Sequence, residues 1–450
     1  MTGLDQSEPE SSISALVARG LSKLNALVIA LSNSADPAER STATSHRARL
    51  KLWAGNLGAH RPSGTHSLEY RLRDAPSIRN HVITLLRGLC KSADEAQALT
   101  CLSTDHDSHS DAGTADSIDL ELEEYFQEES GQDDSEIAAI LDDIGHTIDC
   151  LLRLSITIRS PAPHAKFKSR VAVVERLEQW DVKHVREKFP TANDIISARL
   201  GRAIAWRRQY FKYREKHCAR LAHGLDEETD TAQEDGSVGE WSTTVASSIS
   251  ERLKGQQVES ASFVDESRSD TSQTSYAPSS ADGTRSRVPP MPQESCDGPF
   301  ECPFCRTIVS IESREEWKTH VFRDLEPYIC LAEDCRTPEK HYSRRSDWMN
   351  HMKQEHWRAW QCPFECQTHS MRAEQFQEHI IGTHRDHPIS RKVDSLEVLS
   401  GYVDLERAQG QCPLCAEVQI ISDQHYISHI AEHLESLALF ALPDLGMQED

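Results

Sequence analysis

A pattern of two cysteines followed by one or two histidines occurs four times between residues 302 and 433 of the sequence. Thiolates and imidazoles at these spacings are the usual ligands of tetrahedral Zn²⁺ in Cys2His2 zinc fingers. A finger of about thirty residues buries too little apolar surface to fold alone, so bound metal has to supply folding free energy. The repeat therefore predicts an array of ββα-type zinc fingers in the last third of the chain.

Three of the four units have a complete ligand set, and we number the units one to four in chain order. Each unit also has a large apolar residue three positions before its first histidine, where a ββα finger places its small core. These core residues are Trp317, Trp348, Phe376 and Tyr426. The complete ligand sets are Cys330, Cys335, His351 and His356 in finger two, Cys362, Cys366, His379 and His384 in finger three, and Cys412, Cys415, His429 and His433 in finger four.

The first unit has only three of the usual ligands, Cys302, Cys305 and His320. Asp324 stands four residues after His320, at the place of the missing histidine, and a carboxylate oxygen can bind zinc. Two interpretations stay open. In the first, Asp324 is the fourth zinc ligand; in the second, the unit has only three ligands or binds no metal. The sequence thus predicts three to four structural Zn²⁺ ions.

The cysteine pairs of fingers one and four also have the C-x-x-C spacing of thiol oxidoreductases, in the strings CPFC (302–305) and CPLC (412–415). A thioredoxin-like site needs a βαβ context and one dominant dithiol. Here each pair is followed by histidines at helical spacing, which favours zinc.

Helical periodicity predicts an α-helical domain over residues 1–225. Residues 104–136 contain thirteen Asp and Glu and no Lys or Arg, which indicates a disordered acidic insert at about 103–133. Residues 226–298 are rich in Ser, Asp and Gly and predict a disordered linker. We expect three packed fingers over 299–385 and a fourth finger with a C-terminal helix over 386–450.

The expected fold class is therefore mainly α, with a small α+β array of zinc fingers. Because only the array depends on metal, we expect chelation to unfold residues 300–442 and to spare 10–225. The individual helices are predicted over 1–35, 74–102, 134–159, 168–188 and 191–223.

The segment 196–222 alternates arginines and lysines with Trp206, Tyr210, Phe211 and Tyr213. Such a helix can bind nucleic acid or an acidic partner, or act as a nuclear import signal. Its alternative is an amphipathic helix whose aromatic side chains enter the core while its cations pair with the acidic insert. The charge pattern favours this second interpretation.

The 450-residue chain has a net charge of −23, which argues against binding nucleic acid through the phosphate backbone alone. No stretch of eighteen apolar residues and no secretory signal is present, so we expect no membrane span. Reduced cysteines at zinc spacing place the chain in the nucleus or cytoplasm.

Several long strings of this sequence resemble a family of filamentous-fungal proteins that combine an α-helical N-terminal region with an oxidoreductase-like C2H2 zinc-finger array. The family's H-V-F-x-D-L string is similar to residues 320–325 and includes Asp324. The resemblance implies zinc binding and a fungal source, and it implies no biochemical activity. The matching strings are KLWAGNLGAH (51–60), LLRLSITIRSPAPHAKF (151–167), RLGRAIAWRRQYFKYREKHCARLA (199–222), WKTHVFRDLEPYIC (317–330) and HLESLALFALP (433–443).

The array itself is not basic, with eleven Lys and Arg against fourteen Asp and Glu over residues 300–384. At the helix positions that read bases, fingers one and three present Glu315, Glu316, Glu374 and Glu378, and only finger two offers a suitable set, which includes Arg344 and Asn350. The connections between the first three fingers are short.

Trp357 and Trp360 stand in the second of these connections. Large aromatic residues there indicate either an exposed protein-binding surface or an inter-finger core. We expect a zinc-binding regulatory protein that binds another protein, with a sequence-specific DNA-binding transcription factor as the alternative. The chain lacks the common nucleotide-binding and hydrolase motifs, so we expect no enzyme and no small-molecule substrate.

Overall fold

The computed structural model describes residues 12–33, 37–106, 136–158, 175–225, 287–364, 366, 370–385, 387 and 393–444. The predicted acidic insert lies outside the described residues from 107 onward, and the predicted linker lies outside them up to 286. The chain forms two compact units. The first contains Met1–Pro163, Arg214–Tyr276 and Pro292–Ile311, and the second contains His164–Tyr213, Ala277–Met291 and Glu312–Asp450.

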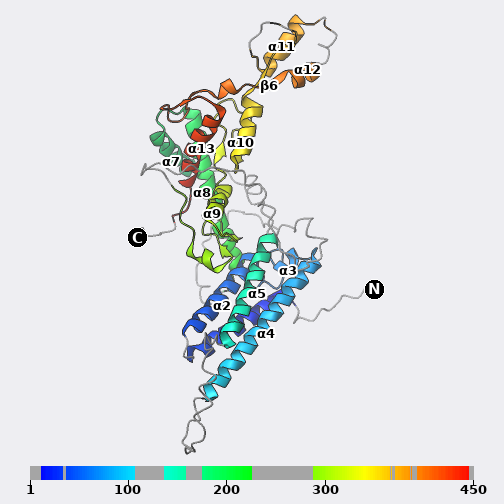
Figure 1. Ribbon diagram of the computed structural model, residues 1–450, viewed down its shortest axis with the longest axis vertical. Coiled ribbons are helices and arrows are strands. Elements are labelled where there is room, and N and C mark those ends of the chain that lie inside the picture. The colour runs from blue at the N-terminus through cyan, green and yellow to red at the C-terminus, as the bar shows by residue number, and fades with distance from the viewer. Residues whose placement is uncertain are drawn as a thin grey trace, which may run out of the picture. The chain divides into compact units, whose positions relative to one another are not determined.

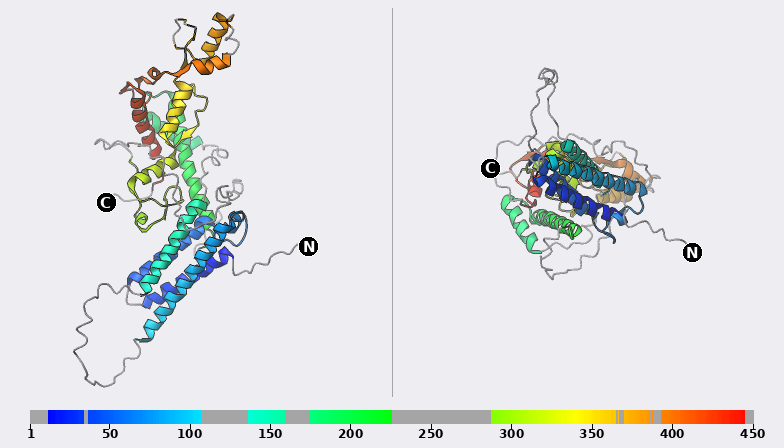
Figure 2. Two further views of the ribbon diagram at one scale, coloured as in Figure 1. Left: turned by 45° about the vertical axis from the view of Figure 1, so that its right-hand side comes forward. Right: turned by 90° about the horizontal axis from the view of Figure 1, so that it is seen from below.

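The first unit is built on a bundle of long helices, α1 (Ile13–Ala30), α2 (Pro37–Leu57), α4 (Pro76–His106) and α5 (Glu136–Ile158), with a short helix α3 (Leu68–Arg71). The long helices run side by side (Figures 1 and 2) and bury one shared apolar core. Helix α1 begins after Ser12, whose hydroxyl accepts a hydrogen bond from the Ala15 amide. The predicted helical N-terminal region is thus confirmed.

Helix α1 is long and apolar enough, by length and composition alone, to cross a membrane. Its inward face nevertheless belongs to the bundle core, where Leu16, Leu24 and Leu27 are fully buried. A core helix of a bundle meets the same criteria as a membrane span, so burial in the bundle accounts for the apolar sequence.

Helix α2 has no counterpart among the helices predicted from the sequence. Its inward face consists of small and polar residues together with a few large apolar ones, and includes Ala43, His46 and Ala54. Gly145 of α5 leaves room for the His46 ring, because a Cβ at that position would lie 2.8 Å from a ring carbon. Because small and polar residues line the packed face, the sequence of α2 shows only a weak apolar periodicity. The periodicity therefore did not predict this helix.

The second unit combines zinc fingers with two helices, α7 (Glu175–Lys188) and most of α8 (Asp194–Ala222). The part of α8 that belongs to this unit ends at Tyr213. Val185, Leu200 and Ile204 share one core with Trp348 and Leu434. This division differs from the predicted helical domain over 1–225, because the apolar face of α7 and α8 is buried against the fingers.

Three of the fingers have the ββα order. A β-hairpin precedes each helix, and each hairpin pairs antiparallel. The core residues predicted from the sequence, Trp317, Trp348, Phe376 and Tyr426, are all buried. The elements are β1 (Phe300–Glu301), β2 (Ile308–Val309) and α9 (Arg314–Leu325) in finger one, β3 (Tyr328–Ile329), β4 (His341–Tyr342) and α10 (Arg345–His351) in finger two, and β7 (Gly410–Gln411), β8 (Gln419–Ile420) and α13 (Asp423–Leu439) in finger four.

Finger three is inserted between two strands that pair with each other. Strand β5 (Arg358–Trp360) pairs antiparallel with β6 (Gly401–Val403), and α11 (Ala373–Thr383) and α12 (Val393–Ser400) lie between them in the chain. In Figure 1 these two helices lie together beside β6. The pairing of β5 with β6 brings the end of finger two next to the start of finger four.

Fingers two and four therefore pack on each other, while finger three has a core of its own. Tyr426 of finger four stacks on Trp348 at 5.8 Å between ring centroids and meets Trp357 edge-on at 5.2 Å. The core of finger three is formed by Cys362, Phe376, Ile380 and Leu396. The sequence had grouped the first three fingers together and set the fourth apart, and it could not show that β5 pairs with β6.

The last described residues of the predicted linker are ordered. Residues Gln293–Asp297 form a 3-10 turn, and the Pro289 carbonyl accepts a hydrogen bond of 3.0 Å from the indole of Trp317. This contact satisfies the indole N–H of a buried finger residue and ties the last residues of the predicted linker to finger one.

In the basic segment of α8, aromatic side chains point into the core, and several arginines donate hydrogen bonds to backbone carbonyls. Trp206, Tyr210 and Phe211 are buried. Arg207 is also buried and donates hydrogen bonds to the carbonyls of Leu325, Glu326 and Pro327 at the end of α9. Burial lowers the pKa of Arg207 to about 10, so the guanidinium stays charged at neutral pH. The amphipathic interpretation holds for these aromatic residues. The described partners of Arg207 are carbonyls, and the acidic insert expected to pair with the cations lies outside the described residues from 107 onward.

Because α7 and α8 share a core with the fingers, zinc removal should affect more than the fingers. We expect chelation to expose the amides of α7 and of Asp194–Tyr213 to hydrogen exchange along with the fingers, and to leave α1, α2, α4 and α5 protected. Exchange measured by mass spectrometry with and without chelator tests this. Full protection of Asp194–Tyr213 in the zinc-free chain would contradict the shared core.

Asp181 of α7 predicts a pH dependence of the second unit. The carboxyl is buried, and burial raises its pKa to about 6 although Arg208 lies 3.3 Å away. The folded state therefore favours the protonated acid, and stability is lost as pH rises from the unfolded pKa toward 6.

We expect Asp181→Asn to raise the free energy of unfolding at pH 7.5 by about 2 kcal/mol, since a neutral amide avoids burying the charge. Urea unfolding of the zinc-loaded protein at pH 7.5 and 5.5 measures this, and the gain should shrink at the lower pH. Arg186→Gln, which removes an exposed ion pair with Asp194, serves as a control that changes little. Equal destabilisation of Asp181→Asn at both pH values would refute the role of burial.

Candidate metal centres

The structure places the sixteen predicted ligands in four clusters. In each cluster one possible ligand atom per residue lies within 4.8 Å of all the others. The clusters are Cys302, Cys305, His320 and Asp324; Cys330, Cys335, His351 and His356; Cys362, Cys366, His379 and His384; and Cys412, Cys415, His429 and His433.

Finger two has the separations that a tetrahedral zinc site requires. Zn–S bonds near 2.3 Å and Zn–N bonds near 2.0 Å imply S–N separations of about 3.5 Å across the tetrahedron. Cys330 Sγ lies 3.2 Å from His356 Nε2, and Cys335 Sγ lies 3.5 Å from His351 Nε2. The four side chains thus surround a space of the size of one Zn²⁺ ion.

A local change of helix type brings the two histidines of finger two together. His351 and His356 are five residues apart, which on a regular α-helix would point them in different directions. The helix continues after His351 as a π-helical turn over Met352–His356, closed by a hydrogen bond from the Trp357 amide to the Met352 carbonyl. A π-turn places residues five apart on the same face, so here it serves the metal site.

Finger three solves the same five-residue spacing by ending its helix. Helix α11 ends at Thr383, and His384 follows as its C-terminal cap. His384 Nε2 lies 3.3 Å from Cys362 Sγ and 3.1 Å from Cys366 Sγ. The buried Nε2 of His379 has no hydrogen-bond partner among the described residues. A metal ion would satisfy this nitrogen, so the side chains fit Zn²⁺.

Finger four uses regular helical spacing. His429 and His433 lie one turn apart on α13 with their Nε2 atoms 3.1 Å from each other, and Cys415 Sγ lies 3.4 Å from His429 Nε2. These values agree with the tetrahedral N–N and S–N separations of about 3.3 and 3.5 Å. His425 lies one turn earlier on α13 and is not part of the cluster.

Finger one combines three conventional ligands with a carboxylate. His320 and Asp324 lie one turn apart on α9, and His320 Nε2 is 3.3 Å from Asp324 Oδ2. Cys302, Cys305 and His320 are buried. The carboxylate oxygen thus lies at the distance expected for two ligands of one zinc ion, about 3.3 Å.

The electrostatics of finger two show what the metal has to supply. Burial, together with the neighbouring Cys335, raises the pKa of the Cys330 thiol to about 12. Burial also lowers the pKa of His351 and of His356. Without metal the Cys330 thiol and both imidazoles are therefore neutral, and zinc must displace the thiol proton, so the apparent zinc affinity rises with pH.

Hydrogen bonds to the metal-binding loops from α8 and from the residues just before it were not expected from the sequence. Arg199 donates to the Cys330 carbonyl, and Arg214 donates to the Cys305 carbonyl. The hydroxyl of Thr191, between the two helices, donates to the Leu414 carbonyl. The only sequence signal was the arginine-rich composition of residues 196–222, which equally suits nucleic-acid binding.

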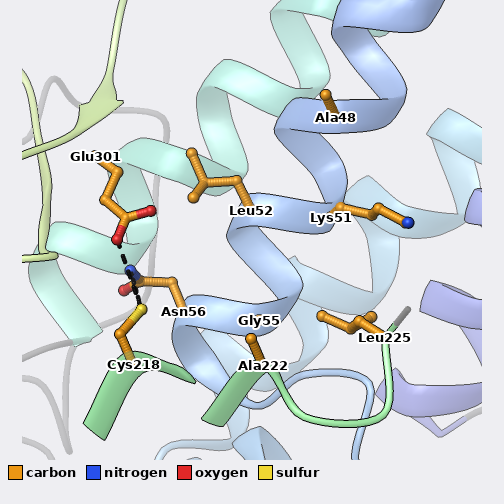
Figure 3. Close-up of a pocket in the computed structure, with 9 residues that line it drawn as sticks. All are labelled: Ala48, Lys51, Leu52, Gly55, Asn56, Cys218, Ala222, Leu225 and Glu301. Atoms are coloured by element: carbon orange, nitrogen blue, oxygen red, sulfur yellow. Dashed lines mark hydrogen bonds between the residues drawn. The ribbon is translucent and has the colours of Figure 1, made fainter. Parts of the chain in front are cut away.

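The first unit contains a small cavity of about 240 Å³ next to finger one (Figure 3). The Cys218 thiol lies there, 3.6 Å from a Glu301 oxygen and 3.9 Å from the Asn56 amide nitrogen. A carboxylate beside a thiol does not favour the reactive thiolate. The cavity is also below the usual range of small-molecule sites, which begins at about 300 Å³.

Comparison with known proteins identifies the first finger. Residues 297–325 match the sequence family described as "Oxidoreductase acuF-like, C2H2 type zinc-finger". No curated protein matches the chain, and no solved structure matches it. The matched segment contains Cys302, Cys305, His320 and Asp324, so the expected family of C2H2 fingers is confirmed for this segment. With four clusters compatible with Zn²⁺, three of them made of two cysteines and two histidines, the chain is a zinc-binding protein.

Asp324 is the ligand whose role can be tested most directly. If it completes the first site, Asp324→Ala should lower the zinc content from four ions per chain to three, while Asp324→His should retain four. Native mass spectrometry of the purified protein counts the ions. Asp347→Ala changes an exposed carboxylate of finger two and should keep all four. Retention of four ions by Asp324→Ala would show that Asp324 is not a ligand.

Proposed function

We propose that this protein is a regulatory zinc-finger protein whose array binds another protein, and that it is not an enzyme. Structural zinc holds the array together. Four protein ligands per ion leave no open coordination position for a substrate, as in structural rather than catalytic sites. The oxidoreductase wording of the matched family covers a segment of finger one alone. We further propose that the protein acts in the nucleus or cytoplasm.

Most support comes from an exposed apolar surface on finger three and the segment that follows it. Leu399 of α12 is 81% exposed, and large apolar neighbours are exposed with it. Several exposed large apolar residues in one part of the chain favour a protein–protein contact there. We name this surface the finger-three patch; it consists of Ile381, Val398, Leu399, Tyr402, Val403 and Leu405.

The surroundings of the finger-three patch favour a protein over a nucleic acid. Glu374 and Glu378 on the exposed side of α11 carry charges that repel phosphates. The patch offers apolar side chains, which a protein partner with complementary apolar residues can bury.

Several cations of the array are already paired within it. Lys353 of finger two lies 3.3 Å from Asp423 of finger four, and Arg372 of finger three lies 3.1 Å from Asp334 of finger two. The guanidinium of Arg345 binds Glu435 with a hydrogen bond of 2.9 Å. These pairs connect fingers to each other, so the same side chains are less available to a phosphate backbone.

The two tryptophans between fingers two and three do not carry the proposed surface. Trp357 is buried and belongs to the core shared by fingers two and four. Trp360 is half-buried, and its indole donates a hydrogen bond of 2.8 Å to the Glu397 carbonyl. Of the two interpretations left open by the sequence, the inter-finger core applies.

A sequence-specific DNA-binding function is the second candidate, and finger two supports it. Arg344, Ser346, Asp347 and Asn350 occupy the base-reading positions of its helix, and all four are exposed. The exposed carboxylates Glu315 and Glu316 at the corresponding positions of finger one weigh against a continuous reading surface.

Binding to a random-sequence duplex pool across a salt series distinguishes the two functions. For the zinc-loaded full chain we expect neither salt-sensitive binding nor enrichment of one sequence. Binding through phosphate contacts needs a basic surface and would weaken steeply as salt rises. Micromolar or tighter, salt-sensitive binding that is lost in Arg344→Ala would instead establish the DNA-binding function.

Protein binding is tested with a variant of the finger-three patch. Proteins that crosslink to the zinc-loaded wild-type chain should be lost with Leu399→Asp, because a charge would have to be buried in the contact. Ile29→Asp is the matched control, since Ile29 is an equally large exposed residue in the first unit. An unchanged crosslinking pattern in Leu399→Asp would exclude this surface, and loss of self-crosslinks alone would identify a second copy as the occupant.

A further inference from the structure

Helix α8 reaches into the metal-binding loop of finger two through one arginine. We call this loop, Cys330 to Cys335, the finger-two knuckle. Nη1 of Arg199 donates hydrogen bonds of 2.6 Å to the Cys330 carbonyl and 2.8 Å to the Ala332 carbonyl, and Nη2 lies 3.5 Å from the Glu333 carbonyl. Arg199 is buried, although it lies 131 residues before Cys330 in the chain.

The two carbonyls nearest to Arg199 flank the peptide whose amide faces the ligand sulfur. The Ala332 amide points at Cys330 Sγ at 3.4 Å, and the Cys335 amide donates to the Ala332 carbonyl. A planar guanidinium that holds two of these carbonyls fixes the loop in the shape in which its amides face the sulfur. Hydrogen bonds to metal-bound groups from outside the ligand set commonly tune metal affinity.

The same type of contact recurs at two other metal-binding loops. Nε of Arg214 donates to the Cys305 carbonyl at 2.8 Å. The Thr191 hydroxyl donates to the Leu414 carbonyl at 2.8 Å, and the Leu414 amide points at Cys412 Sγ at 3.5 Å. Recurrence at fingers one, two and four indicates a systematic role of the α7–α8 segment rather than an incidental contact. Finger three, with its own core, provides an internal reference.

We propose that Arg199 is a positioning residue of the finger-two zinc site, so that helix α8 sets how tightly this finger holds its metal. Finger two then contains all four zinc ligands, but its full zinc affinity also requires Arg199 of α8. The inference concerns this chain's own residues around the zinc site and is independent of which partner the array binds.

Arg202 on the same helix is the matched control. It is an arginine of similar position but binds carboxylates, with its Nε 3.2 Å from Glu178 and one Nη 2.6 Å from Glu339. Loss of Arg202 removes a cation from α8 without touching a knuckle carbonyl. A difference between variants at the two positions therefore reports the carbonyl contacts.

The experiment follows zinc loss at single fingers in the full chain. Zinc-loaded wild type, Arg199→Gln, Arg199→Lys and Arg202→Gln are titrated with a zinc chelator and then treated with a thiol-alkylating reagent. Peptide mass spectrometry measures alkylation of Cys330 and Cys335 for finger two and of Cys362 and Cys366 for finger three. Circular dichroism at saturating zinc verifies that each variant is folded.

For Arg199→Gln we expect half-alkylation of Cys330 and Cys335 at a chelator concentration at least about tenfold lower than in wild type. Arg199→Lys should fall between the two, because a lysine keeps the charge but cannot hold two carbonyls with a fixed fork. Finger three should respond alike in all four proteins, and Arg202→Gln should follow wild type.

Wild-type protection of Cys330 and Cys335 in folded Arg199→Gln would overturn the proposal. Should Arg199→Gln not fold even at saturating zinc, Arg199→Lys decides, and its equality with wild type would overturn the proposal as well. An equal loss in Arg202→Gln would also overturn it, since the effect would then belong to the charge of α8 and not to the knuckle.

Discussion

Burial of paired thiolates is the constraint on which the C-terminal part of this protein depends. Cys330 and Cys335 are buried side by side, and burial is the largest of the causes that raise the pKa of Cys330 to about 12. Two neighbouring thiolates are stable there only next to a cation, which Zn²⁺ provides. The helix that completes the site carries Trp348, and Trp348 in turn stacks on Tyr426 of finger four. The metal thus supports not only one finger but also the core that fingers two and four share with α7 and α8.

Chain connectivity explains why the four fingers are not equivalent. Because β5 pairs with β6, the intervening finger three is excluded from the core formed by its neighbours in the chain. It keeps a small core around Phe376 and Ile380 and leaves Val398 and Leu399 exposed. An inserted finger can present apolar side chains without destabilising the shared core, since it contributes little to that core. Under the proposed protein-binding function, finger three is therefore the part of the array expected to contact the partner.

How far the sequence could lead differs from feature to feature. Cysteine and histidine spacing predicted the four clusters because metal ligands are few, chemically distinctive and close in the chain. The helical first unit followed from its apolar periodicity, except for α2, whose face around Ala43 and His46 carries little such signal. The π-turn of finger two could be suspected only from the five-residue spacing of His351 and His356. The packing of α8 on the fingers was beyond sequence reasoning, because it depends on contacts between residues more than a hundred positions apart.

The arginines of α8 show that a basic segment does not by itself indicate a nucleic-acid surface, because arginines can instead bind backbone carbonyls of the same protein. Arg199 and Arg207 are buried, and their hydrogen bonds to described residues go to six backbone carbonyls and to no carboxylate. Short fingers end in loops and helix termini whose carbonyls have no partner within the finger, and a guanidinium with five donors satisfies several of them at once. A lysine could not do so with fixed geometry. The same composition that suggests a nucleic-acid surface therefore arises wherever a helix has to complete the hydrogen bonding of small metal-built domains, and the burial of its cations distinguishes the two cases.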